Sequence, residues 1–268
     1  MASSVPLIDA RPANHRSEEP SPIEAHWLGR MPYREAWDLQ RALAAARADD
    51  RIADQLLLLE HYAVLTLGRH ADESHVRAPA AELARRGIEV LRVERGGEVT
   101  YHGPGQLVAY PILALAARGL LLRPLVRALE GAMADTCAAL GVAAGRRDGH
   151  PGCWADPEGL EPRKIGALGV RVERGVTYHG IALNVDPDLR DFDLIDPCGM
   201  PGVPSTSIAA EAGRPGEPPA TAAVASAAAH FATALALRLN APVVGFPNGV
   251  AGTAAARADL ERMLQGKA

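Results

Sequence analysis

Two apolar segments separated by only two residues constrain the fold of this chain more than any other feature. Residues 164–173 and 176–185 each have the composition of a β-strand, and Arg174-Gly175 connects them. A connection of two residues joins antiparallel strands, because parallel strands need a crossover of a dozen or more residues. The middle of the chain is therefore predicted to contain an antiparallel hairpin.

Further strand-like segments precede this hairpin, and helical patterns flank the strands. Apolar runs and alternation predict one or two strands over residues 55–67 (broken at Glu60-His61) and further strands over 88–93, 98–102 and 106–113, and Cys153-Trp154 is interpreted as the start of another strand. Apolar residues at helical spacing predict helices over residues 33–48, 79–86, 123–140, 207–212, 220–239 and 252–264. Strands in the middle with helices around them predict a mixed α/β domain.

Length and charge limit the class of protein. The chain has 268 residues, of which 48% are hydrophobic, which is enough for a large core. Its 28 basic and 32 acidic residues give a net charge of −4, which disfavours nucleic acid as a partner. We divide the chain into a disordered arm (1–22), one main domain (23–240) and a C-terminal extension with a short helix (241–268).

The same sequence features predict a cytoplasmic location. The first twenty residues contain no apolar run and hence no signal peptide, and three cysteines do not form a disulfide framework. The Ala-rich segment 219–237 contains His230 and is interpreted as a buried or surface helix rather than a membrane span.

Lysine is nearly absent from this chain. Of the 28 basic residues only Lys164 and Lys267 are lysines. An arginine keeps its proton in a protein, whereas a lysine loses it when its surroundings lower its pKa. Lys164 therefore marks either a site that needs a titratable ammonium or a surface lysine without special function.

A glycine-rich segment, 95–106, is the first candidate binding element. Four glycines among residues 95–105 allow a ligand to approach the backbone closely, and Arg95, Tyr101 and His102 add polar and aromatic groups. The segment has neither the Lys-[Ser/Thr] ending of a phosphate loop nor the glycine spacing of a dinucleotide site. It is either a binding loop or a tight hairpin with structural glycines.

Cys198 is the candidate nucleophile. It lies between Pro197 and Gly199 in a loop, where a cysteine has no packing role, whereas Cys137 lies on a predicted helix as a core residue. A nearby cation would lower the thiol pKa, and Lys164 is separated from Cys198 by one hairpin. No Cys-x-x-Cys or paired-His spacing predicts a metal site.

Three long segments, taken in order, resemble the octanoyltransferase family, also called lipoyl(octanoyl) transferases. They are RGGEVTYHGPGQLVAYPIL (95–113), KIGALGVRVERGVTYHGIALNV (164–185) and FDLIDPCGM (192–200). The resemblance implies the fold of biotin and lipoate protein ligases, in which helices flank a large and a small mixed β-sheet. Residues 23–240 would then form the catalytic domain.

The resemblance also assigns roles to individual residues. It implies that Cys198 carries the acyl thioester and that Lys164 lowers the pKa of this cysteine. Cys153 adds a second thiol near the implied site. The implied substrate contacts are Arg95, Gly96, Gly97, Glu98, Val99, Thr100, Tyr101, His102, Ala167, Leu168, Gly169, Gly180, Ile181 and Ala182.

The implied reaction transfers octanoyl from octanoyl-acyl carrier protein to a lysine of apo lipoyl domains, the first step of endogenous lipoate biosynthesis. The implied acceptors are the lipoyl domains of 2-oxoacid dehydrogenase complexes and the glycine cleavage H protein. Neither ATP nor a metal is expected as cofactor, and neither nucleic acid nor a membrane as partner. Three alternatives remain: an ATP-dependent lipoate or biotin ligase, a non-catalytic lipoyl-domain-binding protein, and a cysteine hydrolase that releases the free acid.

Overall fold

An eight-stranded mixed β-sheet forms the centre of the molecule. The computed structural model describes residues 21–197, 202–213, 221–246 and 252–266. The strands of the large sheet lie in the order β11-β1-β2-β6-β10-β9-β8-β7. Their bounds are β1 Ile23–Met31, β2 Asp54–His61, β6 Gln106–Ile112, β7 Ala144–Arg147, β8 His150–Ala155, β9 Arg163–Glu173, β10 Val176–Asn184 and β11 Val243–Gly245. The predicted hairpin of residues 164–173 and 176–185 is confirmed as β9 and β10, which pair antiparallel.

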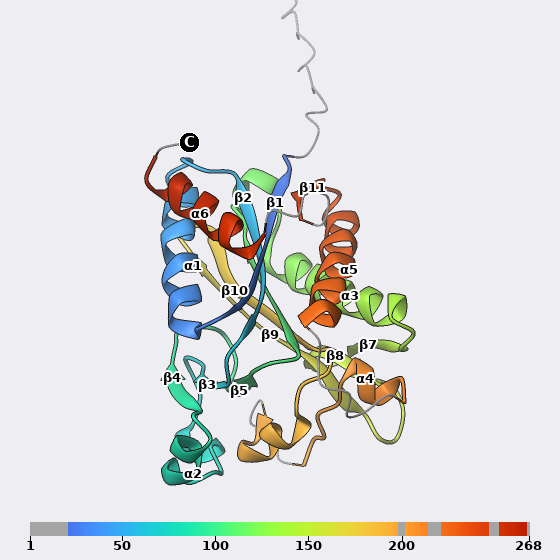
Figure 1. The fold of residues 1–268 in the computed structure, drawn as a ribbon. Helices are drawn as coiled ribbons and strands as arrows, with labels where there is room; N and C mark the ends of the chain where they lie inside the picture. The colour runs from blue at the N-terminus through green and yellow to red at the C-terminus, as the bar shows by residue number, and fades with distance from the viewer. Residues whose placement is uncertain (1–20, 198–201, 214–220, 247–251, 267–268) are drawn as a thin grey trace, which may run out of the picture.

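A second sheet of three strands lies below the first in Figure 1. Its order is β4-β3-β5, with bounds β3 Val64–Leu67, β4 Glu89–Arg92 and β5 Val99–His102. The segment 55–67, predicted as one or two strands, thus forms two, β2 and β3, which belong to different sheets. The chain passes from one sheet to the other at Tyr62-Ala63. The interruption predicted at Glu60-His61 lies just before this point, at the end of β2. The mixed α/β fold with a large and a small sheet is confirmed.

Helices cover both faces of the large sheet (Figure 1). One face carries α3 (Leu122–Ala139) and α5 (Thr221–Leu239), and the other carries α1 (Tyr33–Ala48) and α6 (Thr253–Leu264). The strand β2 shows why, because four consecutive leucines alternate between the faces. Leu56 and Leu58 pack with α3 and α5, whereas Leu57 and Leu59 pack with α1 and α6. This alternation is the period of a strand that is buried on both faces.

Short helices complete the structure. They are α2 (Ala80–Arg85), α4 (Ile208–Glu211) and the 3-10 helices η1 (Glu73–His75), η2 (Ala116–Arg118) and η3 (Leu189–Leu194). Of the described helices, α5 is long and apolar enough to cross a membrane by length and composition alone. Its buried side chains, which include Val224, Phe231 and Leu235, pack into the core beside α3.

Three strands, β1, β7 and β11, have no counterpart in the sequence prediction. β1 contains Glu24, His26 and Arg30, and this polar content conceals the strand; it nevertheless pairs in parallel with β2 and β11. β11 and α6 belong to residues 241–268, the segment taken as an extension. In the structure β11 joins the large sheet and α6 packs against β1 and α1.

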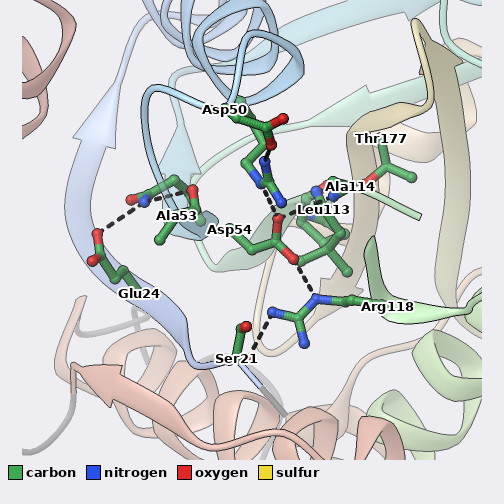
Figure 2. A network of polar contacts seen from close by, with 12 residues as sticks. Ser21, Glu24, Asp50, Ala53, Asp54, Leu113, Ala114, Arg118 and Thr177 are labelled. Carbon is green, nitrogen blue, oxygen red and sulfur yellow. Dashed lines mark hydrogen bonds and ion pairs between the residues drawn. The ribbon is translucent and has the colours of Figure 1, made fainter. Parts of the chain in front are cut away.

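A buried carboxylate fixes the start of β1 to the rest of the domain. Figure 2 shows Asp54 between Arg118 and Ala114. Asp54 Oδ1 accepts from Arg47 Nε at 2.6 Å and from Ala114 N at 3.0 Å, while Oδ2 accepts from Arg118 Nε. Arg118 Nη2 also donates to the carbonyl oxygen of Ser21 at 3.0 Å. One carboxylate therefore holds together β2, α1, η2 and the first described residues.

Candidate active site

A cavity lies where the small sheet meets the hairpin of the large sheet. The residues that line it and that the sequence singled out are Arg95, Gly97, Glu98, Val99, Thr100, His102, Ala167, Leu168, Gly169, Gly180, Ile181 and Ala182. A loop that leads into the small sheet and the two strands of the β9–β10 hairpin thus meet at one cavity.

Two of the implied substrate contacts, Gly96 and Tyr101, do not line this cavity. The Tyr101 ring is 2% exposed and packs edge-on against Phe192, with ring centroids 5.5 Å apart, in the core of the small sheet. Gly96 packs against β9 instead, and an added Cβ would lie 3.2 Å from the carbonyl oxygen of Val170. Both residues therefore support the cavity wall from behind.

Glycines allow the loop to lie directly on the sheet. A Cβ added to Gly169 would lie 2.4 Å from the carbonyl oxygen of Gly96, and one added to Gly180 would lie 2.0 Å from that of Ala109. Real Cβ atoms do not approach backbone this closely, so any side chain here would push the backbones apart. Gly169 and Gly180 therefore allow close contact between backbone segments of this chain.

Arg95 places a guanidinium group in the wall of the cavity. Its side chain is buried, and Nε donates to Thr66 Oγ1 at 3.1 Å while Nη2 donates to the Thr66 carbonyl oxygen at 2.5 Å. Nη1 donates to the carbonyl oxygen of Gly96 at 3.0 Å. These bonds fix the guanidinium between β3 and the loop, so that a positive charge is held near the small sheet.

The structure adds Tyr33, Tyr110 and His179 to the lining of the cavity. His61 lies behind them: its Nδ1 donates to the Met31 carbonyl oxygen at 3.0 Å, and its Nε2 accepts from the Tyr110 hydroxyl at 2.8 Å. Burial lowers the pKa of His61 to about 4, so the ring is neutral. Tyr110 and His179 lie within the segments 95–113 and 164–185 that resemble the family, although neither was assigned to the site, whereas no sequence signal pointed to Tyr33.

His179 is held in a strained and unsatisfied state. Its φ of 55° is left-handed, a conformation that non-glycine residues adopt rarely and that costs free energy within a strand. Both ring nitrogens are buried and have no hydrogen-bond partner among the described residues. Burial lowers the pKa of this imidazole to about 4. Strain and an unpaired buried polar group at a cavity wall are characteristic of functional sites.

A chain of buried amides runs from the cavity to the strand that carries Lys164. His102 Nδ1 lies 2.8 Å from Gln106 Oε1, and Gln106 Nε2 donates to Asn184 Oδ1 at 2.9 Å and to the Tyr101 carbonyl oxygen at 3.2 Å. Asn184 Nδ2 donates to the Thr206 carbonyl oxygen at 2.9 Å. The Thr206 amide in turn donates to the carbonyl oxygen of Lys164 at 2.9 Å. We call these side chains, His102, Gln106 and Asn184, the amide relay.

Lys164 begins β9 at one edge of this region. Lys164 is 7% exposed, and its Nζ lies 5.2 Å from the centroid of the Trp154 ring. Its backbone amide donates to the carbonyl oxygen of Pro204 at 2.9 Å. Cys198 lies outside the described residues, and the described chain resumes at Gly202, two residues before this contact with Lys164.

The second thiol suspected near the site, Cys153, is fully buried. Contact with the Cys137 thiol, and then burial, raise the pKa of Cys153. A thiol with a raised pKa remains protonated and is a poor nucleophile. Among residues 21–197, 202–213, 221–246 and 252–266, no group of three or more His, Cys, Asp or Glu side chains is placed to hold a metal ion.

Comparisons with known proteins match most of the chain. Residues 32–232 match the model of the lipoyl protein ligase A/B catalytic domain. An octanoyltransferase of Chloroflexus aurantiacus is 48% identical over 204 residues, which are 76% of this chain and 89% of that protein. An octanoyltransferase of Acidobacterium capsulatum is 50% identical over 192 residues, 69% of this chain and 78% of that protein.

Solved structures of low sequence identity share the fold. A bipartite lipoate protein ligase from Thermoplasma acidophilum aligns with a TM-score of 0.57 at 13% identity, covering 94% of this chain and 98% of that one. A lipoate-protein ligase A bound with ATP aligns with a TM-score of 0.57 at 14% identity, covering 91% of this chain and 100% of that one. At these identities the comparison supports the architecture of two sheets and flanking helices.

Proposed function

This chain belongs to the octanoyltransferase family, and we propose that it transfers an octanoyl group from acyl carrier protein to a lysine of lipoyl domains through a thioester on Cys198. The observation that carries this proposal is the cavity, because all but one of its lining residues come from 95–113 and 164–185, two of the three segments that resemble the family. Leu168, Ile181 and Ala182 give this pocket an apolar wall, which suits an acyl chain. Each buried CH₂ of such a chain contributes about 0.8 kcal/mol.

In the first step Lys164 acts on Cys198. A charged ammonium beside the thiol favours the thiolate, which attacks the carbonyl carbon of the donor thioester. The bond between this carbon and the phosphopantetheine sulfur breaks, this sulfur takes a proton from the Lys164 ammonium, and the carrier protein leaves with its thiol while Lys164 becomes neutral. The step exchanges one thioester for another and is nearly neutral in free energy. The position of Lys164 supports this role, because its backbone is bonded to Pro204 and Thr206, which follow Cys198 closely in the chain.

In the second step the acceptor lysine attacks the octanoyl thioester. A C–N bond forms, the C–S bond breaks, and Cys198 leaves as a thiolate that takes up a proton. The amine must attack in its neutral form, and Lys164, when it is neutral itself, accepts the proton. Formation of an amide from a thioester is favourable, so the reaction proceeds without ATP.

The proposed partners are octanoyl-acyl carrier protein as donor, and as acceptors the lipoyl domains of 2-oxoacid dehydrogenase complexes and the glycine cleavage H protein. We propose that the enzyme acts in the cytoplasm. Within the protein, the proposed site consists of Lys164, Cys198 and the residues of the cavity wall.

The decisive experiment incubates the protein with octanoyl-acyl carrier protein in the absence of ATP and measures the intact mass. We expect a gain of one octanoyl group, mapped to Cys198 and absent from the Cys198→Ser variant. Addition of an apo lipoyl domain is expected to move this mass to the domain. An adduct that maps to Cys153 would overturn the assignment of the nucleophile.

The same assay separates the alternatives. An ATP-dependent ligase would modify the lipoyl domain only when free octanoate and ATP are supplied, and it would not need Cys198. A hydrolase would lose the octanoyl group to water as free acid while the domain stays unmodified. A binding protein would hold the lipoyl domain without modifying it.

A further inference from the structure

The direction of every hydrogen bond in the amide relay is fixed by two backbone carbonyl oxygens. The Tyr101 and Thr206 carbonyl groups act only as acceptors. Gln106 Nε2 therefore faces Tyr101, and Asn184 Nδ2 faces Thr206. The two remaining amide oxygens follow: Asn184 Oδ1 accepts from Gln106, and Gln106 Oε1 faces the His102 ring. An amide flip at either residue would place two acceptors against each other.

This order determines the tautomer of His102. Because Gln106 Oε1 is an acceptor, His102 Nδ1 carries the hydrogen of the 2.8 Å bond. Burial, followed by the proximity of His61 and Arg95, lowers the pKa of His102 well below its ordinary value, so the ring is neutral. Nε2 then has a free lone pair. His102 lines the cavity, and Nε2 has no hydrogen bond to any described residue.

We propose that His102 is a catalytic residue of the transfer step, whose Nε2 accepts a hydrogen bond from the attacking lysine amine, and that Gln106 and Asn184 are positioning residues for this contact. The inference rests on the proposed function and adds a role to it. Of the reacting groups, the acyl chain is apolar and the thioester oxygen is an acceptor. The amine is the one that carries N–H donors, so it is the group that an unprotonated imidazole nitrogen recognises.

Every bond and proton of the transfer step is accounted for when His102 has this role. The amine nitrogen forms the bond to the acyl carbon as the C–S bond breaks, and one of its protons passes to Lys164 and finally to the Cys198 sulfur. A second N–H bond points to His102 Nε2 and is retained in the amide product. His102 orients the nitrogen lone pair toward the acyl carbon and does not change its own protonation state.

The test measures acylation and transfer separately. The octanoyl enzyme is formed from octanoyl-acyl carrier protein, isolated, and mixed with excess apo lipoyl domain in a single turnover. We expect His102→Phe, which keeps a ring against Tyr33 and His61, still to form the acyl enzyme, with a much larger loss in the rate of transfer than in the rate of acylation. Loss of one oriented hydrogen bond to the amine should slow transfer roughly ten- to hundred-fold. His230→Phe, on the exposed side of α5, is the matched control and should transfer normally.

Two further measurements keep the proposal falsifiable if the His102 variant folds poorly. Two-bond ¹H–¹⁵N correlation spectra of the wild-type protein should show His102 protonated at Nδ1 and unprotonated at Nε2. Gln106→Glu places a carboxylate beside Nδ1 and favours the doubly protonated ring, so transfer should slow while acylation persists. This variant should also move the His102 signals to those of an imidazolium, which a purely structural role of Gln106 would not do.

The outcomes are distinguishable from failure of the proposed function. If the wild-type protein forms no acyl enzyme, the proposed function is wrong, and the role of His102 falls with it. If the acyl enzyme forms but His102→Phe transfers at the normal rate, the role of His102 is wrong and the proposed function stands. A wild-type spectrum with the proton on Nε2 would also overturn the proposal.

Discussion

The ammonium group of Lys164 lies over the indole ring of Trp154, with Nζ 5.2 Å from the ring centroid. The two residues are cross-strand neighbours in β9 and β8. An aromatic face attracts a cation and, unlike a carboxylate, does not neutralise its charge. The ring thus helps to hold the Lys164 side chain in place.

Replacement of Trp154 is predicted to affect both stability and thiol reactivity. Trp154→Leu removes the aromatic face and leaves space in the core, and we expect it to lower the free energy of unfolding by about 2–4 kcal/mol. With Lys164 less well placed, the pH midpoint for alkylation of Cys198 should rise. Trp154→Phe keeps a ring under the ammonium and should retain most of the wild-type midpoint. A midpoint that is unchanged in Trp154→Leu would contradict this role.

Gly152 provides the space for the Lys164 side chain. A Cβ at this position would lie 2.9 Å from Lys164 Cε and 2.6 Å from the Gly166 carbonyl oxygen, and the φ of Gly152 is 134°. We expect Gly152→Ala to lower the free energy of unfolding by about 2–4 kcal/mol and to slow acylation. Gly149→Ala is the control, because its φ is also positive but no atom lies within 4 Å of the added Cβ. Denaturant unfolding should show a cost of only about 1 kcal/mol for the control.

The Cys153 thiol is predicted to be unreactive in the folded protein. Contact with Cys137 and burial raise the pKa of its thiol, so it should resist iodoacetamide near neutral pH in the folded protein. Cys153→Ala should keep octanoyl transfer close to the wild-type rate, and Cys198→Ser should abolish it. Peptide mapping after alkylation in the folded and the denatured state checks the prediction. Labelling of Cys153 in the folded state would refute it.

The buried histidines make stability depend on pH. The pKa of His179 is lowered to about 4 in the folded protein, from 6.5 for an ordinary histidine. Between these values the unfolded chain binds the proton and the folded protein does not, so stability falls as the pH drops from 6.5 through 4. The loss amounts to about 2 kcal/mol at pH 5 for this residue.

His179→Phe should therefore flatten the pH dependence. The variant keeps the ring packed against Tyr178 and removes two buried nitrogens without partners. We expect its free energy of unfolding at pH 7 to rise by about 1 kcal/mol, and its decrease between pH 7 and pH 5 to shrink by about 2 kcal/mol. His61→Phe is the contrast, because it deprives Tyr110 and Met31 of their hydrogen bonds and should destabilise the protein. The free energies of unfolding are measured by denaturant titration at several pH values. If they change with pH by the same amount in wild type and in His179→Phe, the explanation is wrong.

Sequence patterns predicted the helices and strands in which the apolar residues keep a regular spacing. They failed for strands with many polar residues and for very short strands near the edge of the sheet. The helix over 33–48 and the hairpin over 164–185 were predictable because their apolar spacing matches a single period. β1 was not, because it combines Glu24, His26 and Arg30 with buried Ile23 and Leu28, and β11 is only three residues long. Tertiary pairing, rather than local preference, makes both of them strands.

The residues that line the cavity likewise fall into those that the sequence predicted and those that it did not. Glycines and polar residues that are contiguous in the sequence, such as those from Arg95 to His102, were found because they form a recognisable segment. Tyr110 and His179 lie in the segments that resemble the family but were not assigned to the site, and Tyr33 was missed because it looks like an ordinary aromatic residue of a helix. Only the packing of α1, β6 and β10 brings them to one wall, and the left-handed φ of His179 is visible only in three dimensions.

The anchoring of Ser21 has a practical consequence. Arg118 binds its carbonyl oxygen, and Asp54 holds Arg118, so the chain is fastened to the domain from this residue onward. The start of β1 lies at the end of the large sheet opposite the small sheet, whose strand β5 contributes to the cavity (Figure 1). An affinity tag or a fluorescent fusion joined directly before Ser21 should therefore leave both the fold and access to the cavity undisturbed.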